Sequence, residues 1–290
     1  MRLKADLVLL LVAVLWGAAF AAQRIAGLMG SVHFFNAARF LLGALCLLPF
    51  AWRSRPIKGQ VLWSSVAGVI LFVASSLQQV GLRTTGAGNA GFLTSLYVVF
   101  VPFVLFLGWR ERLQALSVFA VFMAALGSYL LSTGGAFQMH WGDLLELAGG
   151  LVWALHVVLL GKFASRYDAV AFSAGQMIVC SALSWIAAAV LETPALPVDP
   201  NLLGSILFTA VISLGLGYTL QIWAQKHTPP ADAALILSLE SVFAAGGGVL
   251  VLGERFAPIQ IIGCVIIVLA VIMSQARAWV RISHTGAVEQ

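Results

Sequence analysis

The sequence predicts an all-α membrane protein with ten transmembrane helices, arranged as two inverted five-helix repeats with both termini in the cytoplasm. Three observations lead to this fold class. Of the 290 residues, 61% are hydrophobic and only 9% are charged, whereas soluble domains carry about 25% charged residues. Apolar stretches of about 20 residues, the length of a membrane-spanning helix, recur along the chain. Residues of the first half also recur in the second. The composition excludes a soluble enzyme, a disordered protein and a nucleic-acid-binding domain.

The apolar stretches form ten candidate spans, and turn or charge signals separate them. The second span ends at Arg53-Ser54-Arg55-Pro56, and the fifth at Gly134-Gly135. A proline-rich loop from Pro194 to Pro200 follows the seventh span, and Thr228-Pro229-Pro230 follows the eighth. The alternating pattern of a membrane β-barrel is absent from the sequence. We therefore expect helices at about 6–27, 34–52, 61–81, 88–108, 113–132, 142–161, 169–191, 202–225, 232–252 and 258–277.

The basic residues predict the orientation, because cytoplasmic loops of membrane proteins carry an excess of Lys and Arg. If the N-terminus is cytoplasmic, ten spans place the C-terminus there too, with 12 basic residues inside and 3 outside. The inner set is Arg2, Lys4, Arg53, Arg55, Lys58, Arg110, Arg112, Lys162, Arg166, Lys226, Arg277 and Arg281, and the outer set is Arg24, Arg83 and Arg255. The first span could also be a secretory signal cleaved after Ala19-Phe20-Ala21, but the repeat gives it a partner in the second half.

The two halves of the chain share residues at two constant offsets. The matched pairs are Asp6 with Asp143 and Trp16 with Trp153 at an offset of 137, and Gln78 with Gln221, Thr85 with Thr228, Ser95 with Ser238 and Glu111 with Glu254 at an offset of 143. Each half holds five spans, an odd number, so the second half must be inverted, as in many secondary transporters. We expect a first repeat at 1–136, a second, inverted repeat at 137–280 and a cytoplasmic tail at 281–290.

Two segments carry a family resemblance. Leu11 to Gly17 (Leu-Val-Ala-Val-Leu-Trp-Gly) and Ala231 to Phe256 resemble the drug/metabolite transporter superfamily, and within it the ten-helix family with two EamA-type repeats. The second segment holds Ser238-Leu239-Glu240-Ser241-Val242 and Leu252-Gly253-Glu254-Arg255. In the first half, Glu111-Arg112 is a weaker match to Glu254-Arg255. Many members have Pro where Ser241 stands, so we expect the local break in the ninth span to be missing.

The resemblance implies a secondary transporter in the bacterial inner membrane. The general likeness is closest to exporters of aromatic and other neutral amino acids. The family also includes exporters of drugs and other metabolites, and importers. We therefore expect an amino acid exporter, with a drug or other metabolite efflux protein, or an importer of the same fold, as the alternative.

Placing a polar side chain in lipid costs free energy, so polar residues within spans usually face the bundle interior or a water-filled cavity. Several share a helix face at i, i+3, i+4 spacing, as Trp153 and His156 do in the sixth span and Tyr218 and Gln221 in the eighth. We predict a central cavity with aromatic walls and amide groups, suited to an amphipathic small molecule. The predicted substrate-binding residues are Trp16, Asn36, Gln78, Tyr97, Trp153, His156, Gln176, Tyr218, Gln221 and Glu240.

Each of these residues also has a purely structural interpretation. The tryptophans can pack the core, and the glutamines can join helices by hydrogen bonds worth roughly 0.6–2 kcal/mol. His156 fits a satisfied buried imidazole. Glu240 is either a proton-coupling or substrate-amine-binding group or a neutral carboxyl joining helices, since a charge at its depth costs about 2.5–3.5 kcal/mol. Arg39 can bind a substrate carboxylate, snorkel to the surface, or pair with Glu146 or another helix.

The sequence supports neither catalysis nor a cofactor. H-E-x-x-H, nucleophile-elbow and P-loop patterns are absent, and Gly86 to Gly91 matches G-x-G-x-x-G without the strand that a dinucleotide site needs. Cys46, Cys180 and Cys264 are scattered in apolar runs, which argues against a disulfide framework or metal site. We expect a small-molecule substrate, an amino acid or similar metabolite, in a bilayer-embedded protein without a nucleic-acid partner. The sequence lacks the pair of catalytic residues that an intramembrane enzyme needs. It also lacks the long loops that a receptor needs. The oligomeric state stays open, with a monomer favoured.

Overall fold

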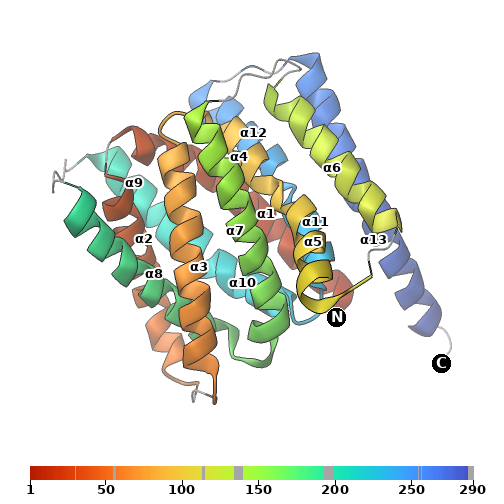
Figure 1. Ribbon diagram of the computed structural model, residues 1–290, viewed down its shortest axis with the longest axis horizontal. Helices are drawn as coiled ribbons and strands as arrows, with labels where there is room; N and C mark the ends of the chain where they lie inside the picture. Colours follow the sequence, from red (N-terminus) through yellow and green to blue (C-terminus); the bar gives the residue numbers. More distant parts are fainter. Residues whose placement is uncertain are drawn as a thin grey trace.

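The computed structural model describes residues 1–29, 31–54, 57–112, 115–133, 140–192, 199–253, 255 and 257–286. Within these ranges the chain consists of helices and short connections, without a strand (Figure 1). The helices follow the apolar stretches, because in lipid a helix satisfies its backbone hydrogen bonds internally. The expected turn at Gly134-Gly135 and most of the proline-rich loop from Pro194 lie outside the described residues, as does Glu254.

Among the described residues, eight helical stretches are long and apolar enough to cross a membrane, and two shorter apolar helices, Ala115–Leu131 and Pro258–Ser274, occupy the fifth and tenth expected spans. The helices are α1 (Arg2–Leu28), α2 (Val32–Ala51), α3 (Gln60–Gly81), α4 (Ala87–Ser95), α5 (Tyr97–Trp109), α6 (Ala115–Thr133), α7 (Trp141–Phe163), the 3-10 turn η1 (Ala164–Arg166), α8 (Ala169–Leu191), α9 (Pro200–Phe208), the π-helical segment η2 (Thr209–Leu216), α10 (Gly217–Ala224), α11 (Pro230–Leu237), α12 (Glu240–Leu252) and α13 (Pro258–Gly286). The last helix continues past the expected end near residue 277.

Two spans are interrupted at equivalent positions of the two halves. The fourth changes from α4 to α5 at Leu96, and the ninth changes from α11 to α12 at Ser238-Leu239. The expectation of an unbroken ninth span is therefore wrong. The hydroxyls of Ser95 and Ser238 each donate to the carbonyl three residues earlier, at 2.7 Å, and Ser241 donates to the carbonyl of Ser238 at 2.8 Å. Such bonds compete with the helical backbone pattern, so this break forms without a proline.

The two halves of the chain are interlaced. Helix α1 packs against α10 and α12 of the second half, and α7 packs against α3 and α5 of the first half. Helices α6 and α13 pair with each other at the right of Figure 1. A Cβ atom at Gly17 would lie 2.7 Å from the carbonyl oxygen of Glu240, so the backbones of α1 and α12 are in direct contact. This interlacing brings α1, α3, α7, α10 and α12 together at the centre.

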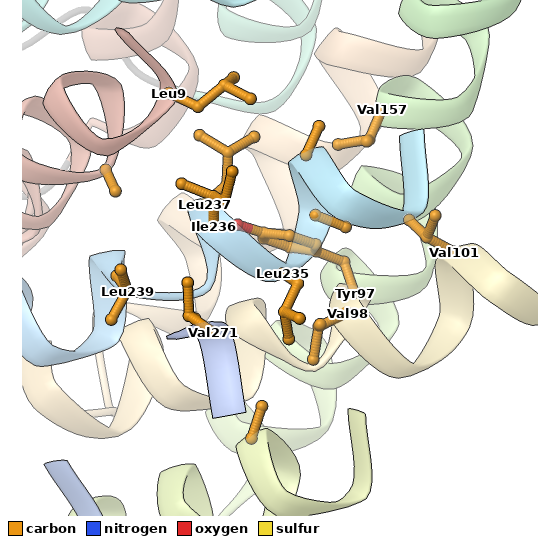
Figure 2. Packing of buried hydrophobic residues seen from close by; sticks show 14 of the residues in the cluster. Leu9, Tyr97, Val98, Val101, Val157, Leu235, Ile236, Leu237, Leu239 and Val271 are labelled. Atoms are coloured by element: carbon orange, nitrogen blue, oxygen red, sulfur yellow. The ribbon is translucent and has the colours of Figure 1, made fainter. Parts of the chain in front are cut away.

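The largest apolar cluster forms one side of this centre. Its buried members come from α1, α5, α6, α7, α10, α11, α12 and α13, and from Leu239 at the break in the ninth span. Figure 2 shows Tyr97 reaching from α5 across Leu235 and Ile236 of α11, with Val157 of α7 close by. The burial of these side chains holds the half-helix that begins at Tyr97 in a fixed place, and so positions the Tyr97 hydroxyl.

Candidate functional site

A cavity lies between the central helices and takes its lining from both halves of the chain. The lining residues are Trp16, Phe20, Gln23, Arg39, Phe40, Gln78, Thr94, Tyr97, Trp153, His156, Val157, Ser213, Leu214, Tyr218, Gln221 and Glu240. The cavity volume is about 40 Å³. One water needs about 10–15 Å³ of such volume. The cavity as it stands therefore holds a few waters, and a larger solute requires the lining to move apart.

Eight of the ten predicted substrate-binding residues line this cavity, and the other two, Asn36 and Gln176, do not. The Asn36 side chain donates from Nδ2 to the carbonyl of Ser75 at 3.2 Å, which joins α2 to α3. The Oε1 atom of Gln176 lies 2.9 Å from Nε2 of His156 and so orients that ring from behind. Both residues therefore support the site from outside the cavity.

Four aromatic rings form one wall. The rings of Trp153 and Tyr218 are nearly parallel, with centroids 6.4 Å apart. The ring of His156 stands edge-on to both of them, at 5.8 Å and 5.6 Å. Trp16 approaches Tyr218 from α1, with centroids 5.2 Å apart. Offset and edge-to-face contacts of this kind stabilise aromatic clusters, and the wall offers an apolar surface to the body of a solute.

The repeat-related tryptophans make different hydrogen bonds. Trp153 donates from Nε1 to Oε1 of Gln78 at 3.1 Å. The equivalent bond would join Trp16 to Gln221, but Trp16 donates instead to the backbone carbonyl of Ser213 at 2.9 Å. That carbonyl lies in η2, whereas the corresponding part of α3 is regular α-helix. Both amide atoms of Gln221, a fully buried residue, are left without a partner among the described residues.

Tyr97 and Glu240 stand at matching positions of the two halves, at the offset of 143, and lie within electrostatic reach of each other. Each is the first residue of the half-helix that follows a break, α5 for Tyr97 and α12 for Glu240. Both are buried, with exposed fractions of 3%. Within the described part of the chain, the Tyr97 hydroxyl and the Glu240 carboxyl interact with each other, and the hydroxyl and Oε1 of Glu240 have no other hydrogen-bond partner. The two breaks thus aim a hydroxyl and a carboxyl into one cavity.

Arg39 lies at another part of the lining. Its guanidinium donates from one terminal nitrogen to Oε1 of Gln23 at 2.7 Å, and it lies over the rings of Phe35 and Phe40 at 4.8 Å and 5.2 Å. The side chain is buried and does not snorkel. Glu146 is not its partner, since Glu146 accepts a hydrogen bond from the Thr94 hydroxyl at 3.0 Å.

Several lining residues were absent from the predicted site. Phe20 and Gln23 follow Trp16 at i+4 and i+7, so a stripe along the first span is the signal that could have found them. Arg39 was considered as a binding residue but not included, and Thr94 is a polar residue of the fourth span. Ser213 contributes a backbone carbonyl exposed by the π-helical segment, and no side-chain pattern could have indicated it.

A matching pair of hydrogen bonds lies at the starts of α1 and α7. The Thr85 hydroxyl donates to Oδ1 of Asp143 at 2.8 Å, and the Thr228 hydroxyl donates to Oδ1 of Asp6 at 2.8 Å. All four residues are buried. Each bond joins the N-terminal part of a central helix to the connection between two spans of the other half, so the same contact occurs twice.

The site offers recognition chemistry: unpaired donors and acceptors beside an aromatic wall. In the described ranges, no group of three or more His, Cys, Asp or Glu side chains is placed to hold a metal ion. The sequence profile of the EamA-like transporter family matches residues 3–133 and again residues 140–275.

The chain belongs to the EamA-like transporter family.

Named relatives extend over most of the chain. An uncharacterized transporter of Archaeoglobus fulgidus is 35% identical over 280 residues, which cover 95% of this chain and 87% of the relative. The threonine/homoserine exporter RhtA of Escherichia coli is 27% identical over 263 residues, 88% of this chain and 86% of the exporter. A solved crystal structure with 20% identity has a TM-score of 0.77, covering 96% of this chain and 98% of its own, and shows the same fold.

Family and fold together place this EamA-like transporter in the membrane. Its apolar helices and its bacterial transporter relatives identify an integral, multi-pass protein of the inner membrane. The family consists of transporters and not of enzymes.

Proposed function

We propose that this chain is a secondary transporter that exports amino acids by alternating access through the central cavity. The observation that carries the proposal is the convergence of eight predicted polar and aromatic side chains, from both halves, on one cavity. Such a lining suits a small solute with an apolar body and a polar head. The likeness to the threonine/homoserine exporter RhtA supports an amino acid as the solute and export as the direction.

The proposal includes two inverted repeats, 1–136 and 137–280, with both termini in the cytoplasm. The two separate family matches and the duplicated Asp–Thr contact support a repeat. In Figure 1 the start of α1 and the end of α13 lie toward the same lower side of the molecule, as an even number of spans requires. Exchanging the conformations of two inverted halves converts a cavity open to one side into a cavity open to the other.

The test is flux of radiolabelled neutral amino acids into liposomes that contain the purified protein. Saturable uptake, with cross-competition between amino acids, is the expected result. The variant Trp153→Ala should raise KM about 10-fold, because an aromatic contact worth about 1.4 kcal/mol is tenfold in affinity. Trp141→Ala is the matched control, since Trp141 lies in the same helix and is 71% exposed.

Two outcomes would contradict the proposal. If the folded protein transports no amino acid, the alternative function, efflux of drugs or other metabolites, replaces the proposed one. Equal KM values in the wild type and a stable Trp153→Ala variant would remove the central cavity from the transport path. Direction is tested separately, by amino acid accumulation in cells that express or lack the protein: export lowers the internal concentration, and an importer raises it.

A further inference from the structure

We propose that Gln221, Glu240 and Tyr97 form a head-group subsite, which binds the ammonium and carboxylate of an amino acid at the side of the cavity built by α5, α10 and α12. This inference rests on the proposed function and adds the chemical class of the ligand: a zwitterion that carries both charged groups. It also gives the substrate one orientation, with its side chain against the aromatic wall.

The first step is the contrast between the two repeat-related glutamines. Gln78 Oε1 accepts a hydrogen bond from Trp153, so this amide is already engaged. Gln221 is fully buried, yet within the described residues neither its Oε1 nor its Nε2 has a partner. Its expected partner, Trp16, is held by the Ser213 carbonyl. Of the two equivalent amides, Gln221 is therefore the one with both its acceptor and its donor without a partner among the described residues.

The second step is the free-energy cost of burying an amide without a hydrogen-bond partner. A buried amide without a hydrogen bond loses the hydration that it had in water and receives nothing in exchange. Buried polar groups in native proteins nearly always have partners, and an exception needs an explanation. Five residues with such atoms line the same cavity: Arg39, Tyr97, His156, Gln221 and Glu240. Tyr97 and Glu240 interact with each other, whereas Gln221 has both amide atoms without a partner among the described residues. A head group bound beside Gln221 would satisfy both amide atoms and reach the Tyr97–Glu240 pair.

The third step matches the chemistry of these groups to a head group. Oε1 of Gln221 and Oε1 of Glu240 are acceptors, which suit the three N–H donors of an ammonium. Nε2 of Gln221 and the hydroxyl of Tyr97 are donors, which suit a carboxylate. An α-amino acid carries both groups on one carbon, so a single solute can use acceptors and donors together.

The fourth step concerns charge. The lining holds one guanidinium, that of Arg39, and one carboxyl, that of Glu240. A zwitterion adds no net charge to this cavity, whereas an amine or a carboxylic acid of the same shape adds one. In a water-poor site an added charge is expensive. The cavity should therefore prefer the whole amino acid to analogues that lack either charged group.

The fifth step places the rest of the solute. Tyr218 lies one turn before Gln221 on α10, and its ring is nearly parallel to that of Trp153. A side chain attached to a head group at Gln221 would reach these rings first. This order predicts that apolar and aromatic side chains bind better than small polar ones, while the head group sets the requirement for a zwitterion.

The experiment measures inhibition of L-phenylalanine flux in liposomes by 2-phenylethylamine, which lacks the carboxylate, and by 3-phenylpropanoate, which lacks the ammonium. Against the wild type, both analogues should inhibit at least 10-fold more weakly than unlabelled L-phenylalanine. In Glu240→Gln, the preference for L-phenylalanine over 3-phenylpropanoate should fall to less than 3-fold. Gln221→Leu should raise KM about 10-fold or more. The control is Gln225→Leu, one turn after Gln221 and outside the cavity lining, and it should change KM by less than 3-fold.

Each other outcome has a definite meaning. Equal effects of Gln221→Leu and Gln225→Leu on KM, or an unchanged preference in Glu240→Gln, would overturn the head-group subsite. Saturable wild-type flux would leave the proposed function standing. Absence of saturable flux of any amino acid by the wild type would overturn both. Gln221→Glu is the second variant in case Gln221→Leu does not fold: it keeps the acceptor and loses the donor, so inhibition by 3-phenylpropanoate should weaken at least 3-fold. Unchanged inhibition would overturn the donor assignment.

Discussion

At the scale of single residues, the most informative side chains are the buried polar ones that occur twice. Asp6 and Asp143 each accept a hydroxyl hydrogen bond from an equivalent threonine at 2.8 Å. A carboxylate at the edge of a bilayer needs such donors, because burial without them costs more than an ordinary lost hydrogen bond. The repetition of the whole contact indicates that the requirement comes from the fold and not from one local accident.

Removing one hydroxyl tests that requirement. We expect Thr228→Val and Thr85→Val each to lower the free energy of unfolding by about 1–2 kcal/mol, because a carboxylate loses a donor of nearly unchanged shape. Thermal unfolding of the detergent-solubilised protein measures the effect. Thr84→Val is the matched control, since Thr84 is exposed and adjacent to Thr85. Unfolding midpoints that are the same for all three variants would contradict the structural role of the contact.

At the scale of helices, close backbone contact decides where α1 lies. Gly17 leaves room for the carbonyl oxygen of Glu240 and the amide nitrogen of Ala244, at 2.7 Å and 2.8 Å from where its Cβ would be. Small residues at such crossings are how membrane helices approach each other closely. The same contact fixes the start of α12, and therefore the position of the Glu240 side chain in the cavity.

A methyl group at this crossing should separate the two helices. We expect Gly17→Ala to destabilise the protein by about 1–3 kcal/mol through overpacking, and also to reduce transport because α12 shifts. The control is Gly246→Ala, a change in the same helix pair where the added methyl meets no atom within 4 Å. The measurements are thermal unfolding and amino acid flux. If both variants behave alike, the α1–α12 crossing has more freedom than its geometry indicates.

The helices also show what the sequence could and could not predict. Apolar length located all ten spans, because a bilayer requires it. The break at Ser238-Leu239 was missed, because serine hydroxyls that bond to nearby carbonyls leave a much weaker signal than proline does. The π-helical segment η2 has no signature in its composition. The prediction from polar and aromatic residues within spans identified eight lining residues. Spacing alone could not tell that Asn36 and Gln176 face neighbouring helices instead of the cavity.

At the scale of the whole molecule, the proposed inversion of the repeats makes a topological prediction. Thr84 and His227 occupy equivalent positions, at the offset of 143, and both are exposed. If the halves are inverted, these two residues lie on opposite faces of the membrane. Residues at equivalent places in two parallel repeats would lie on the same face.

Labelling of single cysteines at these two positions tests whether the two repeats are inverted. In a background without Cys46, Cys180 and Cys264, Thr84→Cys should react with a membrane-impermeant maleimide in intact cells. His227→Cys should react only in inverted membrane vesicles, because its loop is cytoplasmic when both termini are. Labelling of both cysteines from one side would contradict the inverted arrangement, and a reversed pattern would contradict the orientation.

The interlacing of the halves has a consequence for how the chain is made. Asp6 and Thr228 are 222 residues apart in sequence, and at about 5–20 residues per second the ribosome needs roughly 10–45 s to synthesise the chain between them. During that interval the first helix lies in the membrane without its later partners. Arg2, one turn before Asp6 on the same helix, donates to its carboxylate at 2.9 Å. The first helix therefore carries a counter-charge for Asp6 before Thr228 has been synthesised.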